Sequence, residues 1–159
     1  MLFRSQCIRL LRRELGTRFI GGFNHNEYTV KHYGDCLVSD PTATDKKNYI
    51  RTLKSNPVCV ATTGLHGSIG SKFAEYIACA RAIVTERLVY EVPGELRAGL
   101  NYLEFSDAAQ CVEQALRLVG DHALRNDMMT ANSLYYRSYV RPDALMLNSL
   151  LTVLSMTTR

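Results

Sequence analysis

The stretch that decides the fold runs from Val58 to Glu86 and has the sequence VCVATTGLHGSIGSKFAEYIACARAIVTE. At its two ends, Val58–Thr62 and Ala82–Thr85 are short, continuous runs of the kind found in strands that are buried on both faces. Between them lie a loop with three glycines and a helix predicted from about Gly70 to Arg81. Buried strands separated by a helix predict a parallel sheet with helices packed on both faces.

The other elements are predicted from apolar periodicity and from glycine, proline and capping residues. In chain order they are a helix that ends at Gly16, a strand over Arg18–Phe23, a helix over Tyr28–Tyr33, a strand over Cys36–Val38, a helix over Asn48–Ser55, a strand over Tyr102–Phe105, a helix capped by Asp107 that runs to Gly120, and helices over Ala123–Val140 and Pro142–Leu154. Together they predict an α/β fold, namely a Rossmann-like doubly wound parallel sheet with C-terminal helices. We expect residues 17–159 to form this domain and residues 1–16 to form an N-terminal amphipathic helix.

The N-terminal segment MLFRSQCIRLLRREL is rich in arginine and nearly free of acidic residues. Such a composition is also found in organellar presequences. We favour a surface helix laid over the domain, or one inherited from an upstream domain, because the pattern runs directly into a predicted strand.

Composition restricts the class of protein. A chain of 159 residues with 47% hydrophobic and 21% charged residues suits one ordinary globular domain and argues against disorder. The net charge of +4 comes largely from the N-terminal arginines, so the sequence predicts no nucleic-acid partner. Five cysteines without a CxxC pair predict free thiols in a reducing cytoplasm and no metal site. No apolar run approaches the roughly 18 residues of a membrane span.

The glycine loop and the first turn of the following helix bring small, polar and charged residues together. They are Gly64, His66, Gly67, Ser68, Gly70, Ser71, Lys72 and Glu75. In open parallel sheets, ligands bind beyond the carboxyl ends of the strands, beside the N-termini of helices. Glycines let backbone N–H groups approach a ligand, and a helix N-terminus attracts anions. The loop therefore predicts a phosphate-binding site.

Lys72 and Glu75 have two interpretations. A lysine in the first turn of a helix interacts unfavourably with the positive end of the helix dipole. An anion bound between the lysine and the helix N-terminus would offset this repulsion. Glu75 lies one turn later on the same face and can accept hydrogen bonds from a sugar diol. Alternatively, the two residues form an exposed ion pair that stabilises the helix by under about 0.5 kcal/mol.

Other candidate residues are less specific. His66 can line a phosphate pocket or be an ordinary surface residue, and Glu91 and Glu95 follow the second strand and can reach the same cleft. The segment GSIGSK departs from the Walker loop because its lysine follows the serine. The sequence assigns no catalytic residue.

Two runs in the sequence resemble the C-terminal, donor-binding half of GT-B glycosyltransferases of the "group 1" type. These runs are GSIGSKFAEYIACARAIVTE (67–86) and GLNYLEFSDAAQCVEQALRLVGDHALRNDMM (99–129). The matching pieces are the loop and helix Gly67 to Glu75, the turn and strand Ala78 to Val84, the strand segment Gly99 to Asp107, and the helical segment Leu116 to Met129. The resemblance covers about residues 48–147.

The resemblance implies binding of a nucleotide-diphosphate sugar as the donor substrate, without an obligatory metal. It implies that Glu75 holds hydroxyl groups of the donor, that Lys72 binds the diphosphate, and that the backbone of Gly67 to Ser71, including Ser68 and Gly70, completes the cradle. The family's acidic residue eight positions before the helix glutamate is absent, because Gly67 stands there. The sequence thus resembles a divergent branch of the family.

GT-B enzymes build their active site between two Rossmann-like domains, and the N-terminal one largely binds the acceptor. This chain has room for little more than the second domain, so the resemblance implies that the acceptor domain is separate or missing, with residues 1–16 as its tail. The leading hypothesis is a cytoplasmic glycosyltransferase donor domain that is incomplete alone. The alternative is a non-catalytic α/β nucleotide-binding or protein-interaction domain.

Overall fold

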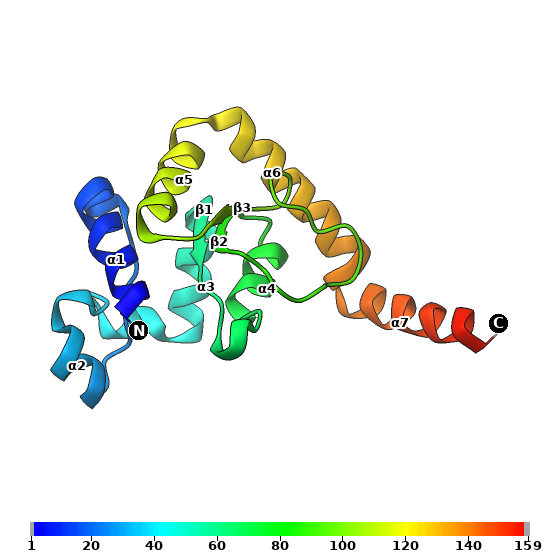
Figure 1. Ribbon diagram of the computed structural model, residues 1–159, viewed down its shortest axis with the longest axis horizontal. Helices are drawn as coiled ribbons and strands as arrows, with labels where there is room; N and C mark the ends of the chain where they lie inside the picture. Colours follow the sequence, from blue (N-terminus) through cyan, green and yellow to red (C-terminus); the bar gives the residue numbers. More distant parts are fainter. Residues whose placement is uncertain (1, 158–159) are drawn as a thin grey trace.

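The computed structural model describes residues 2–157, which form helices around a small sheet (Figure 1). The elements are α1 Leu2–Leu15, α2 Glu27–Tyr33, α3 Lys46–Ser55, β1 Val58–Ala61, α4 Ser71–Ala78, β2 Ala82–Glu86, β3 Leu103–Phe105, α5 Ala108–Gly120, α6 His122–Tyr135 and α7 Pro142–Thr157. Single 3-10 turns occur at Gly16–Arg18, Gly34–Cys36, Pro41–Thr44 and Leu65–Gly67, and a π-helical turn occurs at Tyr136–Val140. The fold is therefore α/β, as the sequence predicts.

The three strands of the described chain form one parallel sheet in the order β1-β2-β3. Val58 pairs with Ala82, and Val84 pairs with Leu103. The predicted strands at the two ends of the Val58–Glu86 stretch are thus confirmed as neighbours, joined by the loop and α4 as a βαβ unit.

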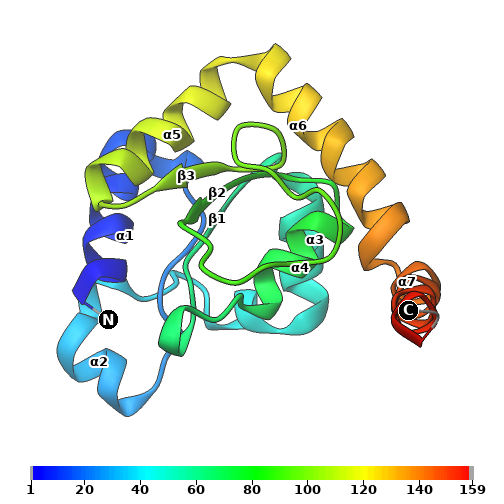
Figure 2. The same cartoon turned by 45° about the vertical axis from the view of Figure 1, so that its right-hand side comes forward.

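Helices cover both faces of the sheet, with α1 and α5 on one and α3 and α4 on the other (Figure 2). Side chains alternate between these layers. Val58 and Val60 pack toward α1 and α5, whereas Cys59 and Ala61 pack toward α3 and α4. The central strand β2 is the most enclosed, with its first three residues fully buried. A parallel strand buried on both faces needs the unbroken apolar sequence found here.

The predicted strands at Arg18–Phe23 and Cys36–Val38 are wrong. The structure has only an isolated parallel bridge between Phe23 and Leu37 there. A Cβ at Gly22 would lie 2.6 Å from the backbone at Leu37, so glycine permits the close approach of the two segments. The two segments pair over too few residues to make a ladder.

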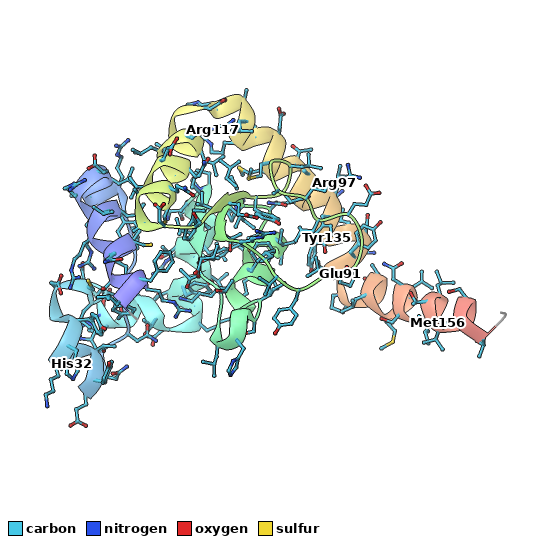
Figure 3. All side chains as sticks on the ribbon, in the orientation of Figure 1. His32, Glu91, Arg97, Arg117, Tyr135 and Met156 are labelled. Carbon is cyan, nitrogen blue, oxygen red and sulfur yellow. The ribbon has the colours of Figure 1, made fainter. Side chains whose placement is uncertain are left out.

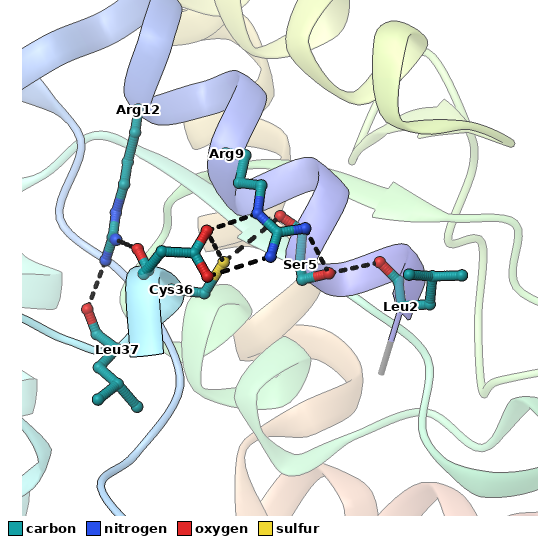
Figure 4. Close-up of polar contacts among 7 residues, drawn as sticks. Leu2, Ser5, Arg9, Arg12, Cys36 and Leu37 are labelled. Carbon is teal, nitrogen blue, oxygen red and sulfur yellow. Dashed lines mark hydrogen bonds and ion pairs between the residues drawn. The ribbon is translucent and has the colours of Figure 1, made fainter. Parts of the chain in front are cut away.

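Arginines of α1 hold these segments in place (Figure 4). Arg9 forms a two-point ion pair with the Asp35 carboxylate, at 2.6 and 3.1 Å. The hydrogen bond from Arg9 lowers the pKa of Asp35 to about 2. Arg12 donates to the carbonyls of Asp35, Gly21 and Leu37. Two of the arginines that give the N-terminal segment its positive charge therefore make contacts within the protein. Helix α1 itself packs on the sheet.

A buried pair of asparagines fixes α6 across the edge of the sheet. The Asn132 side chain donates to the carbonyls of Arg81 and Asn101, at 2.7 and 2.9 Å, and accepts a hydrogen bond from the Asn101 amide at 3.0 Å. Both side chains are almost inaccessible to solvent. Buried amides are stable only when their hydrogen bonds are satisfied, so this contact specifies where α6 lies.

Several predicted boundaries shift. Helix α4 ends at Ala78, three residues before the predicted end, because Ala80 adopts a positive φ of 51°. Cys79 thus follows the helix instead of lying inside it. Helix α6 ends at Tyr135 and continues as the π-helical turn. The capping role of Asp107 is confirmed, since its carboxylate accepts a hydrogen bond from the Gln110 amide at 2.8 Å.

The five cysteines are free, as predicted, and four of them are buried. Within residues 2–157, no helix combines the length and the apolarity that crossing a membrane requires.

Substitution at the core-facing side of α1 tests whether this helix belongs to the domain. Leu11 is 2% exposed and Leu2 is 66% exposed. We expect Leu11→Ala to lower the free energy of unfolding by about 2–5 kcal/mol, because it leaves a cavity between α1 and the sheet. Leu2→Ala on the same helix is the matched control, with an expected change within about 0.5 kcal/mol. Urea unfolding measures both, and equal effects would contradict the packing of α1.

Candidate functional site

The glycine loop leaves the carboxyl end of β1 and is anchored to the next strand. The Glu86 carboxylate, at the end of β2, accepts hydrogen bonds from the backbone amide and hydroxyl of Thr63, at 2.6 and 3.2 Å. Arg4 of α1 donates to the Thr63 carbonyl at 2.6 Å. The start of the loop is therefore fixed from two sides by charged side chains.

The middle of the loop makes a tight turn in left-handed backbone conformations. His66 has a φ of 56° and Gly67 a φ of 74°. A Cβ at Gly67 would also lie 2.8 Å from the Val89 side chain, so glycine is required on two grounds. The Tyr90 hydroxyl donates to the His66 carbonyl at 3.1 Å. This contact joins the glycine loop to the loop that follows β2.

The N-terminus of α4 has no side-chain cap. Gly70 occupies the cap position, and nothing lies within 4 Å of the place where its Cβ would be. Ser68 and Ser71 are exposed on either side of it. The first N–H groups of α4 therefore have no side-chain acceptor, in a position that a ligand can approach.

The neighbouring helix α3 repeats this feature. Its cap residue, Asp45, makes no side-chain hydrogen bond to the first turn, which instead carries Lys46 and Lys47. Because α3 leads into β1 and α4 leads into β2, both helices run opposite to the strands. Their N-termini therefore lie at the carboxyl edge of the sheet, where their dipoles favour anions.

Lys72 and Glu75 form one cluster with residues of α3. The ion-pair partner of Glu75 is Lys46, which donates to its carboxylate, and not Lys72. The ammonium groups of Lys46 and Lys72 lie 5.5 and 5.9 Å from the centre of the same Tyr49 ring. The cluster thus places two cations and one carboxylate around a single aromatic side chain.

The electrostatic environment keeps Glu75 ionised. Partial burial acts to raise its pKa, but the hydrogen bond from Lys46 and the positive charges of Lys46 and Lys72 lower it below the ordinary value of 4.5. Burial of the Tyr49 hydroxyl, together with the neighbouring Glu75 carboxylate, raises the pKa of Tyr49, so this side chain stays neutral. At neutral pH the cluster carries a net charge of about +1.

The structure brings the predicted site residues together only in part. Gly67, Ser68, Gly70 and Ser71 line the turn into α4. Lys72 and Glu75 lie on the side of α4 that meets α3, beside that turn. Lys46 and Tyr49 were missed by sequence reasoning, although two lysines at a helix N-terminus are the same unfavourable pattern that singled out Lys72. Arg4 was missed because no local pattern links it to Thr63, 59 positions away.

A pocket of about 360 Å³ lies beside the glycine loop, within the segment that follows β2. It is lined by Leu88, Tyr90, Glu91, Val92, Gly94, Leu96 and Tyr102. Tyr135 of α6 fixes this segment by donating to the Pro93 carbonyl at 2.6 Å, and Figure 3 labels both Tyr135 and Glu91. Glu95 instead pairs with Arg97. Of the two predicted acids, Glu91 lines the pocket and Glu95 does not.

No group of three or more His, Cys, Asp or Glu residues within 2–157 can hold a metal ion. Burial raises the pKa of Cys59 to about 12, so its thiol is not a ready nucleophile.

Comparisons of the chain with protein-family models, with curated proteins and with solved structures find no match.

The ion pair between Glu75 and Lys46 makes stability depend on pH. Because the pKa of folded Glu75 lies below 4.5, the carboxylate stabilises the fold above that pH, and the effect is lost as the pH falls through the folded pKa. We expect Glu75→Gln to lower the free energy of unfolding by about 0.5–1 kcal/mol at pH 7 and to have a smaller effect near pH 3, where the folded carboxylate is closer to protonation. Urea unfolding at both pH values measures the difference.

Glu113→Gln on an exposed position of α5 is the matched control. It is expected to change stability little at either pH. A Glu75→Gln effect that is the same at pH 3 and pH 7 would contradict the ion pair as its cause.

Proposed function

We propose that this chain is the donor-binding domain of a glycosyltransferase and that it binds a nucleotide-diphosphate sugar at the carboxyl edge of its sheet. In this proposal the three strands belong to a Rossmann-like, doubly wound domain, which is one half of a GT-B architecture. The observation that carries the proposal is the uncapped N-terminus of α4, which follows a glycine loop directly after β1.

Electrostatics supports a diphosphate as the bound group. The N-termini of α3 and α4 both lack side-chain caps, yet their first turns carry Lys46, Lys47 and Lys72. Each lysine there is unfavourable by a few tenths to about 1 kcal/mol, which an anion between the lysines and the helix dipoles reverses. Open space at Gly70 leaves room for such an anion next to the backbone.

In this proposal different residues bind different parts of the donor. Lys72 binds the diphosphate, and the backbone of Gly67 to Ser71 cradles it. Glu75 accepts hydrogen bonds from donor hydroxyls, which requires it to share its carboxylate with Lys46. In this proposal the uncharged part of the donor extends toward the pocket beside Tyr90 and Glu91, which adjoins the glycine loop.

Glycosyl transfer creates negative charge on the leaving diphosphate. Helix N-termini and lysines stabilise that charge, and they need no proton transfer to do so. The acceptor is held by a second domain in this proposal, so the chain binds the donor and transfers sugar poorly alone. The free cysteines favour a reducing compartment such as the cytoplasm.

A protein-interaction domain is the second candidate function. It is favoured by α7, whose large apolar side chains are exposed along its whole length. The existing ion pair between Glu75 and Lys46 also favours it, because a paired carboxylate has a structural role without any ligand.

Calorimetric titration with UDP, GDP, ADP and their sugars tests donor binding. We expect at least one to bind, and Lys72→Ala to weaken it by about tenfold or more through loss of a charged hydrogen bond. Gly70→Ala is the sharper variant. Its methyl group meets open space and the backbone φ of −72° suits alanine, so the fold is unchanged while the anion is pushed away.

Gly120→Ala is the matched control, since a Cβ there also meets nothing within 4 Å, far along the chain on α5. It should bind the donor like the original protein. Absence of binding to every nucleotide tested, or binding that Gly70→Ala and Lys72→Ala leave unchanged, would overturn the proposal.

A further inference from the structure

Helix α7 exposes its apolar side chains to solvent. It projects from the body of the domain and packs chiefly on the π-helical turn before it (Figure 1). Its large apolar residues are between 42% and 72% exposed: Leu145, Met146, Leu147, Leu150, Leu151, Val153, Leu154 and Met156. An apolar surface of this extent marks an interaction site.

The polar side of α7 faces the domain. Asn148, Thr152 and Ser155 follow the helical spacing of four and three residues. With Leu151 of the same helix, they line a shallow groove against Pro93, Gly94 and Tyr139. The Asn148 side chain donates to the Ser138 carbonyl at 2.7 Å. The opposite arc is therefore turned outward, and its apolar side chains are more than half exposed: Met146, Leu147, Leu150, Val153 and Leu154.

The charge of α7 selects the kind of partner. No charged residue occurs from Ala144 to Thr157. Helices that lie on membranes carry lysines or arginines on their polar face, which α7 lacks. A neutral apolar face has no like charges to repel a copy of itself, and an antiparallel pairing of two such helices also opposes their dipoles favourably.

The exposed area matches what a pair of chains needs. Five side chains of the outward arc are more than half exposed, since Leu151 lies on the side of α7 that lines the groove. At roughly 100 Å² each, two copies would bury about 1,000 Å² in total, which is the smallest area expected of a specific interface.

We propose that the chain forms a two-fold symmetric dimer in which α7 packs antiparallel against α7 of a second copy. Leu150 lies at the middle of the arc, so the symmetry axis passes beside it and the two copies of Leu150 meet. Leu147 then faces Val153 of the second copy. This inference is independent of the proposed donor site.

Analytical ultracentrifugation over a range of concentrations tests the dimer. We expect a dimer for the original chain, and for Leu150→Glu an approximately 100-fold or larger rise in the dimer dissociation constant, because two carboxylates would be buried together. Leu134→Glu is the matched control, since Leu134 is a 58% exposed leucine on α6. It should leave the dimer intact, and circular dichroism checks that both variants are folded.

Charge pairing tests the geometry. Leu150→Glu and Leu150→Lys, each monomeric alone, should form a mixed dimer when combined. The double variant Leu147→Lys with Val153→Glu should stay dimeric, because antiparallel packing places opposite charges together and parallel packing places like charges together. A monomeric original chain, a dimer that Leu150→Glu leaves unchanged, a failure of the mixed pair to associate, or binding of a monomer to anionic vesicles would each overturn the proposal.

Discussion

The burial of β2 on both faces is the constraint on which the rest of the structure depends. Ala82, Ile83 and Val84 have no exposed surface, so helices must cover both sides of the sheet. Helices α1 and α5 supply one layer and α3 and α4 the other. Because α3 and α4 each lead into a parallel strand, their N-termini are brought to the same edge. The packing of the core thus concentrates positive helix ends where the glycine loop lies.

The same edge is held together by charged contacts that are distant in sequence. Glu86 fixes the start of the glycine loop, Arg4 reaches it from α1, and Lys46 of α3 holds Glu75 of α4. These contacts give the loop a defined shape without a ligand. They also connect the N-terminal helix to the candidate site, so α1 is a structural part of the domain that presents it.

How far the site could be predicted depended on the range of the interactions. The glycine loop, its place after a buried strand and the helix that follows it depend on local residues, so their positions were predicted correctly. The orientation of Lys72 and Glu75 toward Tyr49 could not be predicted, because it depends on where α3 packs against α4. For the same reason the strands predicted at Arg18–Phe23 and Cys36–Val38 were wrong. Their residues suit strands, but the side chain of Arg12 binds the backbone carbonyls of Asp35, Gly21 and Leu37, a contact that depends on where α1 packs.

The sequence by itself determined the α/β class, the parallel strands and most helices, because unbroken apolar runs and helical periodicity report burial directly. It also determined the arginine-rich composition of the N-terminal segment and the neutral apolar composition of α7. Only the tertiary structure decided which face of α7 meets the domain, since its polar residues turn inward to a groove made by Pro93, Gly94 and Tyr139. Only packing likewise gave Glu75 its partner, Lys46, because the two residues are 29 positions apart and no local pattern couples them.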